Sequence, residues 1–194
     1  MSGIPTAIVL TNGILDSVYA KTCHGLLRGT DRFNIVAVID HRFAGQQIGT
    51  IVPGAKAVPV VSSVHDYLQN FDKPAWCDVG VAFEGGLMPP DFRDSLMIAV
   101  QNGLSVANGL HTLLSEDEEF MEAAKSGNAQ VVDIRKPKSL GELKFWSGEI
   151  LKVDIPRIAV LGMDCAVGKR TTTKFLKVKL RELDINAEMI YTGQ

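Results

Sequence analysis

The stretch RIAVLGMDCAVGKRTTTKF, residues 157–175, combines an apolar strand pattern, a glycine-containing loop and the start of a helix. A loop of this kind aims several backbone N–H groups at one point, and the helix dipole adds about half a positive charge there. Gly162 and Gly168 enclose five residues, a longer interval than in the usual P-loop. The stretch therefore predicts an α/β fold with an anion-binding loop of unusual length.

The residues predicted to bind a cofactor all lie in this loop or in the first turn of the helix. They are Gly162, Asp164, Cys165, Ala166, Val167, Gly168, Lys169, Arg170 and Thr171. Lys169 can reach around the loop to a second phosphate. Arg170 stands where a P-loop carries the hydroxyl that holds Mg²⁺, and Thr171 lies about 100° further around the helix. Phosphate binding is therefore better supported than magnesium-dependent hydrolysis, and no metal site is predicted.

Positive charge gathers near this loop although the whole chain has a net charge of −2. Residues 157–194 carry 7 basic and 4 acidic side chains, whereas residues 1–156 carry 13 and 18. The balance of the whole chain does not indicate a nucleic-acid partner. The local excess is instead suited to a small anionic ligand.

Composition places the chain among ordinary globular proteins, with 46% hydrophobic and 22% charged residues in 194. No apolar run approaches the ~18 residues of a membrane span, and the N-terminus lacks the features of a secretion signal. We therefore expect a cytoplasmic protein with no membrane partner. Cys23, Cys77 and Cys165 are odd in number and widely spaced, which predicts free thiols.

Short β-branched runs alternate with helical patterns through residues 1–136, which predicts a doubly wound, mostly parallel, Rossmann-like sheet. The expected strands are 6–12, 34–40, 57–61, 78–84, 104–108 and 129–134. Apolar residues at helical spacing predict helices near 64–71 and 92–100. Ser115 and Glu118 predict a capping box for the next helix, with Gly127 closing it.

Residues 137–156, bracketed by Pro137 and Pro156, break this alternation and are predicted to be a linker. Residues 157–194 then predict the first βαβ unit of an incomplete P-loop domain, with strands over RIAVLG and AEMIYTG. One such unit cannot cover both faces of its two strands. It must pack on the first domain, on another chain or on a further part of its own domain.

The first domain offers fewer signals for a site. Glu84 and His111 stand at predicted carboxyl ends of strands and are weak candidates for catalysis, each also explained as a cap or structural hydrogen-bond partner. The first strand is followed by a single glycine, so a dinucleotide fingerprint is missing, although Asp40 stands where a ribose-binding acid belongs. NAD binding is thus the less favoured alternative. His24, His41 and His65 show no ligand spacing and are assigned no role.

Several motifs resemble the D-glutamate N-acetyltransferase-like family, which has a Rossmann-like first domain and a P-loop second domain. They are NGLH (108–111), VVDIRKP (131–137), GMDCAVGKRTT (162–172) and YTGQ (191–194). The family loop is close to G-T-D-C-A-x-G-K-M-T-T, so the five-residue interval is the family's own form and is also similar to the loop of dethiobiotin synthetases. This chain departs from the pattern at Met163, where Thr is usual, and at Arg170, where Met is usual.

The resemblance implies acetyl transfer from acetyl-CoA to the amino group of D-glutamate or a related amino acid. We expect the loop amides, Lys169 and Arg170 to hold phosphates of the cofactor. Two alternatives remain open: an ATP-dependent kinase or ligase that uses Mg²⁺, and a non-catalytic nucleotide-binding module. The expected partners are a small-molecule substrate and either a second copy of the chain or a second chain that completes the P-loop domain.

Family members continue well past the T-G-Q segment, whereas this chain ends there at Gln194. A fragment, a protein divided into two chains and a degenerate copy are the three explanations. The activity of the 194 residues by themselves is accordingly left open.

Overall fold

The computed structural model describes residues 3–83, 86–164 and 167–190. The chain divides into two compact units, Met1–Ser139 and Leu140–Gln194, and each is described by itself. No helix within the described ranges is both long and apolar enough to cross a membrane.

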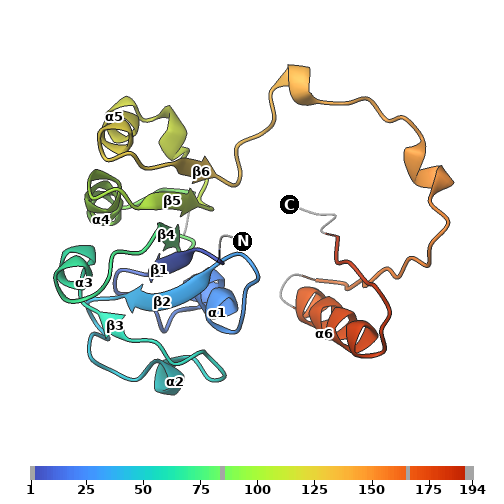
Figure 1. The fold of residues 1–194 in the computed structure, drawn as a ribbon, viewed down its shortest axis with the longest axis horizontal. Helices are drawn as coiled ribbons and strands as arrows, with labels where there is room; N and C mark the ends of the chain where they lie inside the picture. Colours follow the sequence, from blue (N-terminus) through green and yellow to red (C-terminus); the bar gives the residue numbers. More distant parts are fainter. Residues whose placement is uncertain (1–2, 84–85, 165–166, 191–194) are drawn as a thin grey trace. The chain divides into compact units, whose positions relative to one another are not determined.

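A six-stranded parallel sheet forms the centre of the first unit (Figure 1). Its strands are β1 (Thr6–Leu10), β2 (Asn34–Ile39), β3 (Val60–Val61), β4 (Trp76–Val79), β5 (Ser105–Asn108) and β6 (Val131–Asp133). Their spatial order is β3-β2-β1-β4-β5-β6, the order of a dinucleotide-binding Rossmann sheet. This confirms the doubly wound architecture that the alternating pattern predicted.

Helices cover both faces of this sheet, with α3, α4 and α5 on one face and α1 on the other (Figure 1). The helices are α1 (Lys21–Leu27), α2 (Ile48–Ile51), α3 (Val64–Asn70), α4 (Pro90–Gln101) and α5 (Glu118–Ser126), with short 3₁₀ turns η1 (Val18–Ala20) and η3 (Leu114–Glu116). The apolar stripe of α4 is buried through Phe92, Leu96 and Ala99. Strands flanked on both faces need nearly continuous apolar runs, and Ala7–Leu10 are fully buried.

The order in which successive strands are added to the sheet reverses between β1 and β4, which are parallel neighbours. This topological switch point is where open α/β sheets bind ligands, outside the carboxyl ends of the strands. The loops after β1, β2, β4 and β5 all meet this edge, because every strand pair is parallel. The candidate site residues of the first unit are therefore sought in these four loops.

Strand β4 begins and ends earlier than the 78–84 segment that the sequence predicts. After Val79 the chain leaves the ladder, since the Gly80 carbonyl accepts the Cys23 amide at 2.8 Å and the Ala82 amide donates to Tyr19 at 2.8 Å. A Cβ on Gly80 would lie 2.4 Å from Cγ1 of Val9, so only glycine permits this close approach. Contacts with η1 and α1 thus end the strand.

The predicted capping box of α5 is wrong. Ser115 lies in the η3 turn, and Asp117 is the N-cap, with its carboxylate accepting the Phe120 amide at 3.0 Å. Aspartate caps as well as serine and also favours the positive end of the helix dipole. Gly127 does close the helix, and a Cβ there would meet the Val100 carbonyl.

The second unit contains η4 (Leu140–Glu142), η5 (Glu149–Lys152) and the fourteen-residue helix α6 (Lys169–Glu182). The predicted strands are not seen: the described residues of 157–162 and 187–190 belong to no ladder. An isolated strand pair has marginal stability without further strands beside it. The predicted helix is present, and it begins directly after the glycine loop.

Candidate functional site

The glycine loop of the second unit ends at Gly168, the N-cap of α6. Gly168 has φ +90° and ψ 9°, a left-handed conformation that favours glycine. The Thr172 amide donates to the Gly168 carbonyl at 2.9 Å, which closes the first turn of the helix. The N–H groups at the start of α6, before Thr172, have no acceptor within the helix. They therefore point toward the loop. The start of α6 is therefore the candidate anion site of the second unit.

Gly162 is the other fixed point of the loop. A Cβ at this position would lie 2.7 Å from Cγ2 of Val167 and 2.9 Å from Cδ of Lys169. The loop therefore folds closely over Gly162, and its two glycines serve different purposes. Gly162 permits the close approach, whereas Gly168 permits the turn into the helix.

The cation predicted to hold a phosphate lies over this loop. The Nζ atom of Lys169 donates a hydrogen bond to the main-chain carbonyl of Asp164, so the side chain curls back from the helix. Arg170 and Thr171 follow on the exposed surface of α6. Thr173 is not available as a substitute hydroxyl, because its Oγ1 donates to the Lys169 carbonyl at 2.8 Å. The structure thus brings Gly162, Asp164, Val167, Gly168 and Lys169 together.

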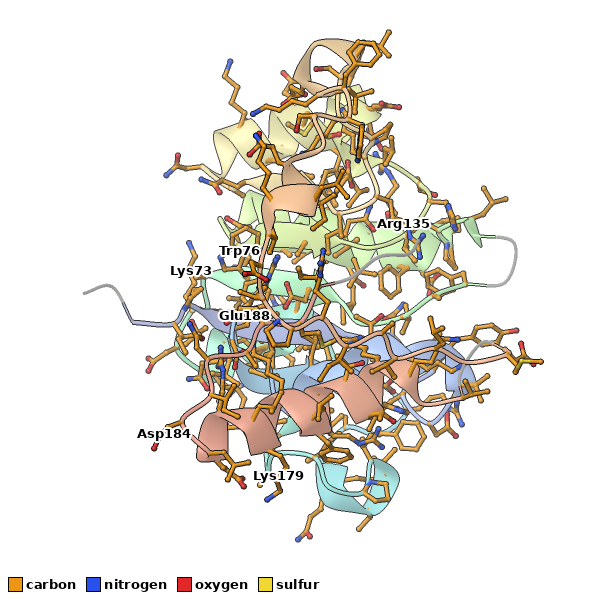
Figure 2. The ribbon with its side chains drawn as sticks, turned by 90° about the vertical axis from the view of Figure 1, so that its right-hand side faces the viewer. Lys73, Trp76, Arg135, Lys179, Asp184 and Glu188 are labelled. Atoms are coloured by element: carbon orange, nitrogen blue, oxygen red, sulfur yellow. The ribbon has the colours of Figure 1, made fainter. Side chains whose placement is uncertain are left out.

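Two of the predicted loop residues, Cys165 and Ala166, lie outside the described residues. Further along α6, Lys177 donates to Glu188 at 2.9 Å, and Arg181 also donates to Glu188, which is labelled with Lys179 in Figure 2. The hydrogen bond from Lys177 holds the pKa of the Glu188 carboxyl below its ordinary value. The positive charge on the later turns of α6 is thus partly balanced by Glu188, whereas the Lys169 ammonium group is bonded within the loop.

In the first unit, Asp40 occupies the loop that would bind a pyrophosphate in a dinucleotide enzyme. Its carboxylate is fully buried and accepts hydrogen bonds from the Thr11 hydroxyl at 2.7 Å, the Gly13 amide at 2.9 Å and the Leu15 amide at 3.1 Å. The loop amides are therefore already bonded to an internal carboxylate. Asp40 is a structural residue, and the ribose-binding role considered for it does not fit these contacts.

His111 lies at the carboxyl edge of the sheet, where the sequence predicts it. Its ring rests on Gly86, where an added Cβ would lie 2.9 Å from Cδ2 of the imidazole. The other weak catalytic candidate, Glu84, lies outside the described residues.

The NGLH turn that carries His111 is built by a buried amide. Asn108 donates from Nδ2 to the Thr112 carbonyl and to Asp133, both at 2.7 Å, and its Oδ1 accepts the Leu110 amide at 3.0 Å. Burial acts to raise the pKa of Asp133, but the hydrogen bonds from Asn108 and Ser115 outweigh it and hold this pKa below its ordinary value. The VVDIRKP and NGLH motifs are therefore joined in space by Asn108 and Asp133.

The sequence assigns no role to His41. In the structure its ring lies against a glycine, as that of His111 does, but on the other side of the switch point. Its ring rests on Gly13, where an added Cβ would lie 2.5 Å from Cε1. Its position directly after Asp40, at the end of a predicted strand, is the sequence signal for this place, whereas the spacing of the histidines indicates no ligand set. Among the described residues, no group of three or more His, Cys, Asp and Glu side chains is arranged to hold a metal ion.

Two open grooves lie at the opposite, amino-terminal ends of the strands. One of about 650 Å³ is lined by Phe33, Asn34 and Lys56, and the other, of about 750 Å³, by Ser105, Met121 and Lys125. Lys56 is already bonded to Asn34 at 2.6 Å. Since ligands of such sheets bind at the carboxyl ends, we assign the candidate site of this unit there and not to either groove.

Buried thiols take no part in either site. Cys23 and Cys77 are buried and free, as predicted. Burial, aided by the nearby Asp40 carboxylate, raises the pKa of Cys23 to about 12, and burial with Asp78 raises that of Cys77. Both side chains are therefore protonated and unreactive at neutral pH.

Family models match most of the chain. Residues 41–137 match a domain of unknown function, DUF1611_N, described as a Rossmann-like domain, and residues 144–194 match DUF1611_C, described as a P-loop domain. The crystal structure of a DUF1611 family protein from Anabaena variabilis is similar, with a TM-score of 0.82 and 31% identity. That similarity covers 92% of this chain and 50% of the Anabaena protein.

Two curated relatives carry the name D-glutamate N-acetyltransferase. The protein from a Pseudoalteromonas species is 29% identical and that from Tritonibacter scottomollicae 27% identical, each over 116 residues. These matches cover 60% of this chain and 34% of each relative, so the aligned region is about a third of their length. Together with the sheet order and the glycine loop, the matches show that the chain belongs to the DUF1611 family, with its Rossmann-like and P-loop domains.

Proposed function

We propose that this chain forms part of an acetyl-CoA-dependent N-acetyltransferase that acts on D-glutamate or a related amino acid. Two relatives bearing the name D-glutamate N-acetyltransferase support this reaction class. The loop before α6 supports the use of a phosphate-bearing cofactor. The observation that carries the proposal is the Lys169 ammonium group, which is held over a loop at the start of a helix.

The residues of the loop fit a phosphate group. Gly162 allows the loop to fold against Lys169, Gly168 turns the chain into the helix, and the first turn of α6 supplies N–H donors. A phosphate would take the Lys169 ammonium in place of its neutral main-chain acceptor, Asp164. Hydrogen bonds between charged groups are roughly twice as strong as neutral ones, which favours that exchange.

A cofactor that needs no magnesium suits this loop. The position after Lys169 carries an exposed arginine instead of the hydroxyl that coordinates Mg²⁺ in nucleotide hydrolases. Thr173 is bonded to the helix backbone and does not replace that hydroxyl. Arg170, the next residue along the helix, would offer a second cation for the phosphates of coenzyme A.

Acetyl-CoA, when bound, supplies the acetyl group as an activated thioester. The chain must supply a base, because the ammonium group of an amino acid has to lose a proton before it can act as a nucleophile. The imidazole of His111, exposed at the carboxyl edge of the sheet, offers a ring nitrogen that can accept that proton. We therefore propose His111 as the base among the described residues.

The test is calorimetric titration of the chain with coenzyme A, and with ATP in the presence and absence of Mg²⁺. Lys169→Ala removes the cation over the loop. Lys179→Ala is the matched control, because Lys179 lies on the same helix, about 15 Å further along its axis, and pairs with Glu182.

We expect magnesium-independent binding of coenzyme A that Lys169→Ala weakens roughly tenfold or more and Lys179→Ala leaves unchanged. Binding of ATP only with Mg²⁺ would instead indicate the kinase or ligase alternative. Binding without acetyl transfer, with D-glutamate and acetyl-CoA both supplied, would indicate the non-catalytic module. Equal binding by the wild type and Lys169→Ala would contradict the role of the loop.

A further inference from the structure

The groove at the amino-terminal ends of β1 and β2 is bordered by two loops of the first unit. One loop leads from α1 into β2, and the other leads from α2 to β3. The Lys56 amide donates to the Leu27 carbonyl at 2.9 Å, and Nε of Arg28 donates to the Pro53 carbonyl at 3.4 Å. These bonds hold the loops together. The groove of about 650 Å³ that they border has the usual size of a small-molecule site.

Part of the groove lining is apolar. Ile4 is 58% exposed, Leu26 and Phe33 are half-buried, and Ile35 is buried. The ring of Phe33 also contacts that of Trp76, labelled in Figure 2, with 5.6 Å between the ring centroids. Apolar surface gains free energy when it leaves water, so an apolar group in the groove would be bound favourably.

The groove also has two cations in its lining, Arg28 and Lys56. Nζ of Lys56 donates to Oδ1 of Asn34 at 2.6 Å and to the Ile35 carbonyl at 3.2 Å, and both acceptors are neutral. Neither cation forms an ion pair with any acid of the described ranges, and none of the described lining residues carries a carboxylate. The groove therefore has a net positive charge that the fold leaves unbalanced.

Both cations can bind a further acceptor. An ammonium has three N–H donors and a guanidinium has five, so the bonds of Lys56 and Arg28 leave donors over. A hydrogen bond to an anion is roughly twice as strong as one to a neutral oxygen. Two like charges in one groove also repel each other, and an anion beside them would offset that repulsion.

The combined lining indicates the class of ligand. A neutral apolar molecule would leave the two cations without an anion, and a free inorganic anion would leave the apolar part of the lining in water. A molecule that has both an apolar body and an anionic group satisfies the whole groove.

We propose that this groove binds an amphiphilic anion, a molecule with an apolar chain or ring and one terminal carboxylate or phosphate. The apolar part lies against Ile4, Leu26 and Phe33, and the anionic group contacts Arg28 and Lys56. The site lies at the opposite edge of the sheet from His111. It does not rest on the proposed function.

The experiment uses the full chain with Trp146→Phe, which leaves Trp76 as the only tryptophan. Trp146 is 76% exposed and belongs to the second unit, so its exchange should not alter the groove. Trp76 then reports on the groove through its contact with Phe33. Octanoate and octyl phosphate, below their micellar concentrations, are the probes and distinguish a carboxylate from a phosphate head group. Octan-1-ol supplies the chain alone, and inorganic phosphate supplies the anion alone.

Three variants change the groove. Lys56→Gln and Arg28→Gln each remove one cation, and Ala55→Leu places a larger side chain in the lining. Lys21→Gln and Arg32→Gln are the matched controls, because both residues are exposed and neither lines the groove. Urea unfolding checks that each variant is folded. If Lys56→Gln does not fold, Arg28→Gln and Ala55→Leu still test the site.

We expect saturable binding of at least one of the two probes, seen by calorimetry and by a change in Trp76 fluorescence. Octan-1-ol and inorganic phosphate should each bind at least about tenfold more weakly, because each satisfies only part of the lining. The head group of the tighter probe then identifies the anion. Absence of saturable binding by both probes, or binding of octan-1-ol as tight as that of the probes, would overturn the proposal.

The variants locate the binding in the groove. We expect Lys56→Gln and Arg28→Gln each to weaken binding of the probe roughly tenfold, because a charge-assisted hydrogen bond is lost. Ala55→Leu should weaken it by a similar factor, and Lys21→Gln and Arg32→Gln should leave it unchanged. Equal losses in the groove variants and in the controls would show general charge attraction and overturn the proposal. Unchanged binding in all the folded groove variants would do the same.

Discussion

At the scale of single residues, Asp78 is the most unusual group in the first unit. It lies in β4 between Val9 of β1 and Ala107 of β5, it is 3% exposed, and neither carboxylate oxygen has a hydrogen-bond partner in the described structure. Burial alone raises the pKa of Asp78 from 3.8 to about 7. A buried carboxyl without a partner prefers its neutral form.

This raised pKa predicts a specific dependence of stability on pH. Between about pH 4 and pH 7 the folded chain retains a proton that the unfolded chain has lost, so stability falls as pH rises through this window and then levels off. Each pKa unit corresponds to about 1.4 kcal/mol. Asp78→Asn is therefore expected to be more stable than the wild type at pH 8, by on the order of 3 kcal/mol, with the difference shrinking toward pH 4.

Urea unfolding at several pH values measures this effect. Asp94→Asn is the control, because Asp94 is an exposed aspartate on α4. It should keep the wild-type pH profile. Parallel profiles for the wild type and Asp78→Asn would show that the folded and unfolded chains bind the Asp78 proton equally, contrary to the expectation.

At the scale of elements, α5 depends on the cap that the sequence did not predict. The Asp117 carboxylate accepts the Phe120 amide at 3.0 Å and pairs with Arg93 of α4 at 2.8 Å. It therefore both starts α5 and joins it to the neighbouring helix.

Asp117→Ala is expected to destabilise the chain by about 1–2 kcal/mol, because a good N-cap and a partly buried ion pair are lost together. Ser115→Ala is the comparison at the cap that the sequence predicts; its side chain bonds Lys136 at 2.8 Å and Asp133, so a smaller loss of about 0.5–1 kcal/mol is expected. Denaturant midpoints of the two variants, compared with the wild type, measure the difference. A larger loss for Ser115→Ala than for Asp117→Ala would restore the capping-box interpretation.

At the scale of the whole molecule, the two units differ in how much they bury. All hydrophobic core residues that are fully buried in the described structure belong to the first unit, between Ala7 and Ala124. No described residue of the second unit is buried, and the apolar side chains of Phe175 in α6 and of Leu183, its C-cap, are about two-thirds exposed, at 67% and 70%. Helices gain most of their stability from packing of an apolar face.

Hydrogen exchange should therefore separate the two units in the full chain. We expect the amides of β1, β2, β4 and β5 to exchange at least about a thousandfold more slowly than in the unfolded chain. Amides of residues 140–190 should exchange close to the unfolded rate, with modest slowing in α6. Mass spectrometry of the native chain, with the urea-unfolded chain as reference, makes the measurement. Strong protection of residues 157–162 would contradict it and support the strand that the sequence predicts there.

Some features of this protein follow from local sequence patterns. The alternation of β-branched runs with helical spacing predicts the doubly wound sheet, because periodicity reports which faces are buried. Gly162, Gly168 and Lys169 predict the glycine loop before α6 by their spacing, since the loop and the helix that follows it are contiguous in the chain. His111 could likewise be placed at a strand end from its position after the 104–108 run.

Other features depend on contacts between residues far apart in the chain. The strand order puts Asp40 into the loop after β1, which turns an apparent ribose-binding acid into a structural acceptor. It also puts His41 on Gly13 and His111 on Gly86, and leaves Asp78 without a partner. Local spacing contains no information about which strands become neighbours, because that choice depends on the packing of the whole sheet. The sequence alone thus determined the fold class and the glycine loop, and only the tertiary structure decided which side chains are bonded within the fold and which are exposed at the carboxyl edge of the sheet.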